Sequence, residues 1–94
     1  LGRRDGYMER QLEESLEIGN VLNIKNEYQQ WLDSNEELIV DASSVARVDA
    51  AGLQALASLF FSAKQANTDI QLVNVPDDLQ ESIKLLDLQS VFEN

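Results

Sequence analysis

The sequence predicts an α/β fold, in which a small mixed β-sheet packs against α-helices in a single domain. Between Leu38 and Leu56 an apolar run ends at Asp41, a short polar connection follows, and Asp49 opens a helix rich in leucine and alanine. Strand-like runs and helix-like periodicities alternate through most of the chain, which favours parallel strands joined by right-handed crossovers. The 94 residues suffice for one core, so we expect one domain.

The first third of the chain is predicted to hold an edge strand and a helix. Residues 1–8 are expected to be a flexible N-terminal segment or residues added to the natural chain, and the domain is expected to span residues 9–94. Whether Met8 is the natural start stays open. Residues Glu9 to Ile18 alternate weakly in polarity, which indicates an edge strand. A helix is expected over residues 20–33, where apolar residues recur at spacings of three and four. These residues are Val21, Ile24, Tyr28, Trp31 and Leu32.

The centre of the chain is predicted to be a buried strand followed by a helix. The run Leu38 to Val40 is too short for a helix and is typical of a strand covered on both faces. Asp49 is a natural N-cap for the next helix, which we expect to end near Lys64 and Asn67. Its buried stripe comprises Leu53, Leu56, Ala57, Phe60 and Ala63. Because Phe60 and Phe61 are adjacent, one of them should face the core and the other should be exposed.

The last third is predicted to add one strand, one helix and a closing segment. Residues Ile70 to Val75 form the strand, which Pro76 ends because it cannot donate a ladder hydrogen bond. Asp77 and Asp78 suit the first turn of a helix. Its apolar face comprises Leu79, Ile83 and Leu86, and Leu88 to Phe92 should pack back onto the core.

Composition excludes several classes of function. The net charge is −10, from 17 acidic and 7 basic residues, which argues against binding nucleic acid or anionic lipid and favours a basic protein partner. Cysteine and histidine are both absent, so thiolate and imidazole chemistry is unavailable, and we expect no catalysis, metal or cofactor. No run approaches the ~20 apolar residues of a membrane span, so we expect a cytoplasmic domain without direct membrane insertion. The oligomeric state stays open.

The motif Val48-Asp49-Ala50-Ala51-Gly52-Leu53 resembles the loop-to-helix junction of the STAS family, the sulfate-transporter and anti-sigma-factor-antagonist domains. The resemblance includes Leu38-Ile39-Val40-Asp41 before the motif and Ile70 to Val75 after it, and it extends from about Leu12 to Phe92. In the family pattern, the residue after the aspartate is a phosphorylatable serine or threonine. Ala50 occupies that position here, so the resemblance implies a domain that lacks the phosphorylatable hydroxyl.

The resemblance implies a non-catalytic protein-interaction module in a bacterial regulatory or signalling complex, with a regulatory kinase of the anti-sigma type as the partner. An alternative is a regulatory subunit of a lipid-transport ABC ATPase assembly. A receiver-like phosphoacceptor domain is a further alternative, since Leu38 to Asp41 is similar to its acceptor strand. That alternative lacks the adjacent acid pair and the lysine that a receiver needs.

The predicted partner surface surrounds the loop and the helix start. Its residues are Ser44, Arg47, Asp49, Ala50, Ala51, Gly52, Gln54 and Ser58. Asp49 caps the helix and can also touch a partner, while Gly52 either admits a close partner or packs tightly on the sheet. Arg47 either pairs with an acid or stays solvated. Ser43 and Ser44 are expected to form a turn, with phosphorylation as the alternative.

Overall fold

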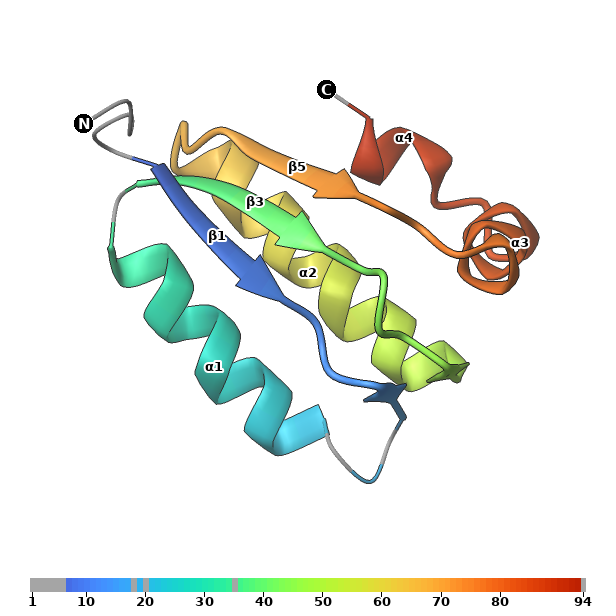
Figure 1. The fold of residues 1–94 in the computed structure, drawn as a ribbon. Helices are drawn as coiled ribbons and strands as arrows, with labels where there is room; N and C mark the ends of the chain where they lie inside the picture. The colour runs from blue at the N-terminus through green and yellow to red at the C-terminus, as the bar shows by residue number, and fades with distance from the viewer. Residues whose placement is uncertain (1–6, 18, 20, 35, 94) are drawn as a thin grey trace.

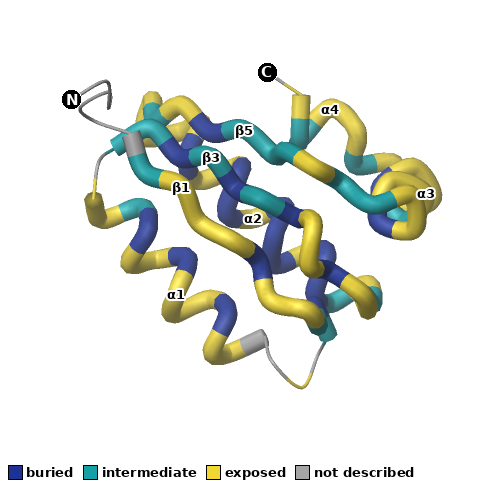
Figure 2. Tube along the Cα trace, viewed as in Figure 1, coloured by how far each residue is buried: buried dark blue, intermediate teal, exposed yellow. Residues whose placement is uncertain are grey.

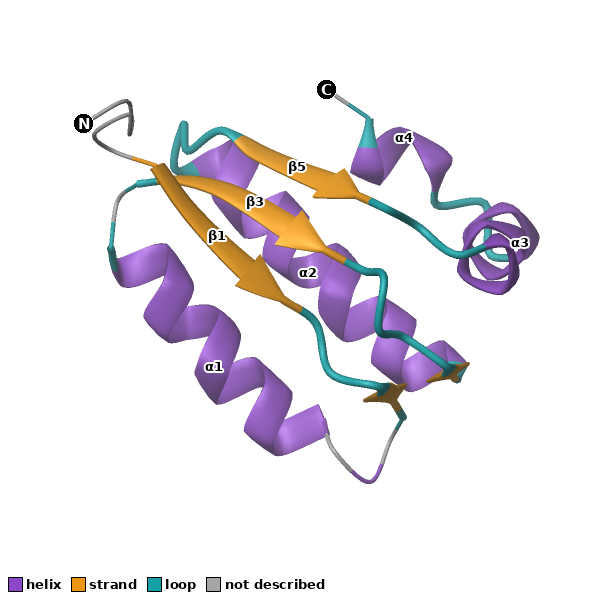
Figure 3. Ribbon diagram, in the orientation of Figure 1, coloured by secondary structure: helices purple, strands orange, loops and turns teal. Residues whose placement is uncertain are grey.

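A computed structural model describes residues 7–17, 19, 21–34 and 36–93 of the chain. It contains short parallel strands and helices in alternation (Figures 1 and 3). In chain order these elements are β1 (Tyr7–Gln11), β2 (Ser15–Leu16), α1 (Val21–Asp33), β3 (Glu37–Asp41), β4 (Arg47–Val48), α2 (Ala50–Gln65), β5 (Ile70–Val73), α3 (Asp77–Leu85) and α4 (Gln89–Phe92).

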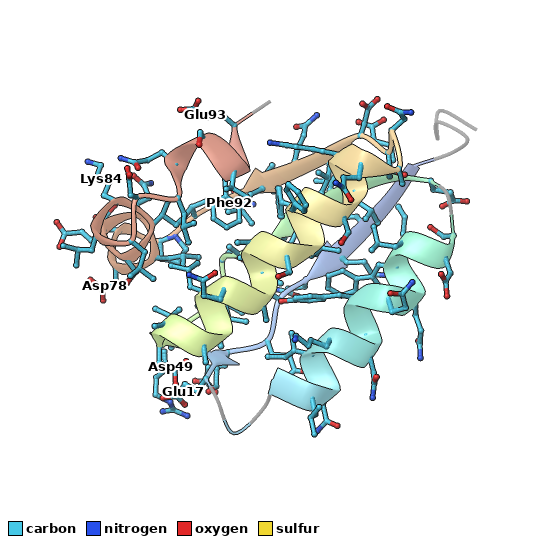
Figure 4. All side chains as sticks on the ribbon, turned by 180° about the vertical axis from the view of Figure 1, so that it is seen from behind. Glu17, Asp49, Asp78, Lys84, Phe92 and Glu93 are labelled. Atoms are coloured by element: carbon cyan, nitrogen blue, oxygen red, sulfur yellow. The ribbon has the colours of Figure 1, made fainter. Side chains whose placement is uncertain are left out.

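The strands form two parallel sheets. A three-stranded sheet has the order β1-β3-β5, and β2 pairs with β4 beside it. All of these described pairs are parallel, which confirms the α/β class and the predicted parallel pairing. The predicted sheet was mixed, whereas the sheet in the described residues is parallel. Helices α1 and α2 lie side by side on one face of the larger sheet, as the views from the two sides show (Figures 1 and 4).

The core lies between that sheet face and the two helices (Figure 2). Leu38 and Val40 of β3 are fully buried there, as are Leu53, Leu56 and Phe60 of α2. The predicted α2 stripe is confirmed at every position, and Phe61 is exposed as expected of the second phenylalanine. On α1, Ile24, Tyr28 and Trp31 are buried, and the Tyr28 and Trp31 rings lie 5.0 Å apart between centroids.

The N-terminal strand differs from its prediction. Pairing with β3 begins at Tyr7 and ends at Gln11, so Tyr7 and Met8 belong to the sheet and not to the predicted flexible segment. The single strand expected from Glu9 to Ile18 is two strands, because the chain leaves the first sheet at the buried Leu12 and re-pairs as β2 with β4. The rest of the predicted flexible segment, residues 1–6, and Ile18 lie outside the described residues.

The prediction that β3 is covered on both faces is wrong within the described structure. Leu38 and Val40 face the helices, whereas Ile39 points to the opposite face and is only half-buried. The apolar run therefore spans a covered and an uncovered face, because successive side chains of a strand alternate between faces.

The C-terminal part departs from its prediction at two points. Strand β5 ends at Val73 and not Val75, because Asn74 adopts a left-handed φ of 56° that turns the chain. Helix α3 begins at Asp77 as predicted, and Leu79 and Ile83 are buried. Leu86, which was predicted to lie on this helix, is its C-cap residue and is 38% exposed, because α3 ends at Leu85.

The closing segment packs back onto α2, as predicted. The Phe92 ring meets the Phe60 ring edge to face with centroids 4.9 Å apart. The Lys64 ammonium, near the end of α2, donates to the carbonyl oxygens of Val91 and Glu93 at 2.7 and 2.9 Å. These contacts fix α4 against the core helix (Figure 4).

Candidate functional site

The loop after β3 is held by side chains at the carboxyl ends of all three strands. Asp41 closes β3, and its carboxylate accepts hydrogen bonds from the Ser43 backbone N–H at 2.8 Å and from the Asn74 side-chain amide at 3.3 Å. The bonds donated by Ser43 are the main reason that the pKa of Asp41 is lowered from its ordinary value. Asp41 therefore stays ionised and bridges the ends of β3 and β5.

Ser43 and Ser44 form a turn at this edge, in agreement with the turn prediction. The Ser44 hydroxyl accepts a hydrogen bond from the Gln11 side-chain amide at 2.6 Å, which ties the turn to the end of β1. Both serines are exposed. Phosphorylation of either serine stays the untested alternative.

The second half of the loop is built by backbone hydrogen bonds that the sequence did not reveal. The Ala46 and Arg47 N–H groups both donate to the Glu14 carbonyl, at 2.7 and 3.1 Å, and Arg47 and Val48 pair with β2 as strand β4. Arg47 Nε lies 3.5 Å from Glu17 Oε1, so this predicted partner residue already has an acidic neighbour within the chain. A two-residue strand is too short to leave a periodic signal in the sequence.

The first turn of α2 follows directly. Asp49 has an extended φ of −122°, and its carboxylate accepts the Gly52 N–H at 2.8 Å, which confirms the predicted N-cap. Asp49 and Glu17 lie at the same end of α2 (Figure 4). The Asp49 N–H in turn donates to the Leu16 carbonyl at 3.0 Å, so the cap residue is bound to β2 as well as to the helix.

Gly52 is buried, and its expected accessibility to a partner is wrong. A Cβ atom at this position would lie 1.9 Å from the Leu16 carbonyl oxygen and 2.2 Å from the Leu16 carbonyl carbon. Both are backbone atoms of β2, which cannot move aside cheaply. The tight-packing interpretation therefore holds: Gly52 lets α2 approach the sheet and does not expose backbone.

The outer side of the same helix start is accessible. Ala50 is exposed, Ala51 is half-buried, and Gln54 and Ser58 are exposed further along α2. Ala50 lines a hollow of about 200 Å³ between the start of α2 and the end of α3. Its other lining residues are Val48, Asp49, Leu53, Ser82, Leu85 and Leu86.

Leu85 and Leu86 bring apolar surface to this hollow, and the sequence prediction missed them. Leu85 is 82% exposed, which makes it a large apolar side chain in water beside the predicted family phosphosite position, Ala50. The available signal was the adjacency of the two leucines, because adjacent helical residues cannot both face the core. The same argument correctly separated Phe60 from Phe61.

The exposed face of α2 continues this surface as a ridge between two hollows. Ser58 and Ser62 line a hollow of about 160 Å³ toward Lys25, Gln29 and Leu32 of α1. On the other side they line one of about 310 Å³ toward Leu88 and Val91. Ala50, Gln54 and Ser58 are exposed and recur at spacings of four, so they share one face of α2. Ser44 lies at the sheet edge, bonded to Gln11.

The side chains around Ala50 are apolar groups with one hydroxyl and one carboxylate group. In the parts of the chain that the structure describes, no three acidic side chains are grouped so that they could hold a metal ion. No described helix has the length and apolar character needed to cross a membrane. The arrangement does combine apolar side chains with exposed hydroxyl and amide groups, which suits contact with another protein.

Comparison with known proteins identifies one family. Residues 9–93 match the family model described as "Mlab, STAS domain". No curated protein matches the chain. The match includes every described helix and strand except the first two residues of β1.

Proposed function

The chain belongs to the STAS family, and we propose from this premise that it binds a regulatory protein partner through the surface around Ala50. STAS domains are protein-interaction modules. In the proposal, the partner contacts Ser44, Arg47, Asp49, Ala50, Ala51, Gln54 and Ser58, together with Leu85 and Leu86. Gly52 positions this surface by packing on β2.

The exposed Leu85 beside Ala50 is the observation that supports this surface most strongly. An exposed leucine is common on protein surfaces, but here it adjoins Leu86, Val48 and Ala50 around one hollow. Burying a leucine side chain contributes roughly 1.5–3 kcal/mol. A partner that inserts an apolar side chain into the hollow would therefore gain affinity by burying Leu85, which is exposed in the free domain.

We further propose that association is not switched by phosphorylation of the helix start. Neither Ala50 nor Ala51 carries a hydroxyl group. The partner is either a kinase of the anti-sigma type or the ATPase of a lipid transporter, and the domain acts without catalysis in the bacterial cytoplasm.

The docking proposal is tested by titrating the purified chain with each class of partner from the same organism in a calorimeter. Leu85→Ser should weaken the complex at least about tenfold, because the leucine anchors the interface. Leu22→Ser is the matched control, since Leu22 is 79% exposed on α1. Wild-type affinity of the Leu85 variant, with weaker binding of the Leu22 variant, would place the interface on α1.

The phosphorylation proposal is tested with the partner kinase and ATP, followed by peptide mapping. The wild-type chain should carry no phosphate between Asp41 and Leu53. Ala50→Ser should become a substrate, since a helix N-terminus stabilises an added negative charge. Stoichiometric phosphate on Ser43 or Ser44 of the wild-type chain would contradict the proposal.

A further inference from the structure

The outer face of the three-stranded sheet has no cover in the described structure. Helices α1 and α2 both pack on the opposite face, as the front and rear views show (Figures 1 and 4). Parallel sheets are found almost only where both faces are covered. This parallel sheet is covered on one face alone by the described elements, so its outer face is unusual for its class.

The strand register defines which side chains share that face. Glu9, Ile39 and Gln71 form one row across the three strands. Gln11, Asp41 and Val73 form the next row, and Glu37 lies beyond the first. Ile39 and Val73 are diagonal neighbours, both half-buried, so the centre of the face is apolar.

Negative charge surrounds the apolar centre. Glu9, Glu37 and Asp41 are on this face, and in the described strands it carries no lysine or arginine, because Arg10 alternates to the other side. The groups bonded to Asp41, the Ser43 N–H and the Asn74 amide, are neutral and leave its charge in place. A second copy of the chain would bring the same acids against them, so self-association through this face is disfavoured.

We propose that the outer sheet face, defined by Glu9, Gln11, Glu37, Ile39, Asp41, Gln71 and Val73, docks a cationic amphipathic helix of a partner protein. The apolar side of that helix covers Ile39 and Val73, and its lysines and arginines meet Glu9 and Asp41. Three strands span two inter-strand spacings, ~10 Å, which is about the diameter of one helix. This surface lies on the opposite side of the sheet from α2, and it adjoins the proposed partner surface where Gln11 donates a hydrogen bond to Ser44.

The charge component is tested with a synthetic amphipathic helix of leucine and lysine, whose binding is followed by two-dimensional NMR. The peptide should shift the amide signals of β1, β3 and β5 and bind more weakly as salt rises. Glu9→Lys should weaken binding about tenfold, whereas Glu27→Lys, an equal charge change at an exposed position on α1, should change it less than about twofold. Equal losses in the two variants, or shifts confined to α1 and α2, would overturn the proposal.

The apolar component is tested with Ile39→Thr, which keeps a β-branched residue in the strand. This variant should fold, as judged by circular dichroism, and bind the peptide at least about threefold more weakly than wild type. Leu22→Thr is the control and should bind as wild type does. Unchanged binding of the Ile39 variant would overturn the proposal, as would sedimentation showing that the wild-type chain dimerises and that Ile39→Thr abolishes the dimer.

Discussion

The inner and outer sides of the first turns of α2 use small residues for different reasons. On the inner side, Gly52 has no space for even one methyl group, because the backbone of Leu16 lies against it. On the outer side, two positions earlier, Ala50 faces an open hollow that would accept a larger side chain. Within one motif, the small residue Gly52 reflects a packing constraint, whereas the small residue Ala50 marks an accessible surface. The two cases differ only in the direction in which a side chain would point.

Truncating the inner side of α2 should give the largest loss of stability. Leu56 is fully buried between the helix and the sheet. Leu56→Ala should lower the free energy of unfolding by roughly 2–5 kcal/mol, through lost burial and the cavity that remains. Urea unfolding measures this change. A midpoint equal to that of wild type would show that the inner face of α2 is misassigned.

Adding one methyl group on the inner side should cost less, but still a clear amount. Gly52→Ala forces the start of α2 away from β2 and should lower the free energy of unfolding by about 1–3 kcal/mol. Gly19→Ala is the control, because a Cβ there meets nothing within 4 Å. If the two variants unfold at the same urea concentration, the close approach of α2 and β2 is not what requires Gly52.

Removing the Asp49 side chain tests the N-cap of α2, which lies between the inner and outer sides of the helix start. Asp49→Ala leaves the Gly52 N–H without its acceptor and should cost ~1 kcal/mol, whereas Asp49→Ser keeps an acceptor and should restore most of the loss. Thermal unfolding followed by circular dichroism compares the two variants. Equal destabilisation by both would assign the stabilisation to the carboxylate charge at the helix start and not to the cap.

Changing the outer side should affect stability least. Ser58 is exposed on the ridge between two hollows. Ser58→Arg should change the free energy of unfolding by less than about 0.5 kcal/mol and weaken the partner complex by adding bulk and charge. Gln30→Arg, on the exposed face of α1, controls for added charge. Wild-type affinity of the Ser58 variant, together with loss of binding on changes in α1, would reverse the assigned surface.

The features that could be predicted from the sequence are those fixed by near neighbours. The Asp49 cap, the α2 stripe and the start of α3 at Asp77 all follow from residues within a few positions of one another. Strands β2 and β4 could not be predicted, because each is two residues long and exists through backbone bonds to a distant segment. For the same reason the pattern from Glu9 to Ile18 predicts one edge strand, whereas the structure has β1 and β2 with a break at Leu12 between them.

The candidate site was predictable in outline but not in its packing. The exposure of Ala50, Gln54 and Ser58 on α2 could be predicted, because exposed positions follow from the helical period. The role of Gly52 was left open between two interpretations, since its neighbour Leu16 comes from another strand. Leu85 and Leu86 were missed because the hollow beside Ala50 forms only when the end of α3 is brought against the start of α2.

The parallel register also constrains how the chain reaches its native state. Met8 aligns with Leu38, Leu38 with Ile70, and Ser15 with Arg47, so each pairing joins positions about thirty residues apart. None of these pairs can form as a local hairpin, because parallel strands need a long connection. Each pair must first close a long loop, which costs conformational entropy. Contacts of such sequence separation place folding at an intermediate speed, slower than a helical bundle. During synthesis, β3 can therefore gain its second neighbour only after the whole of α2 has emerged.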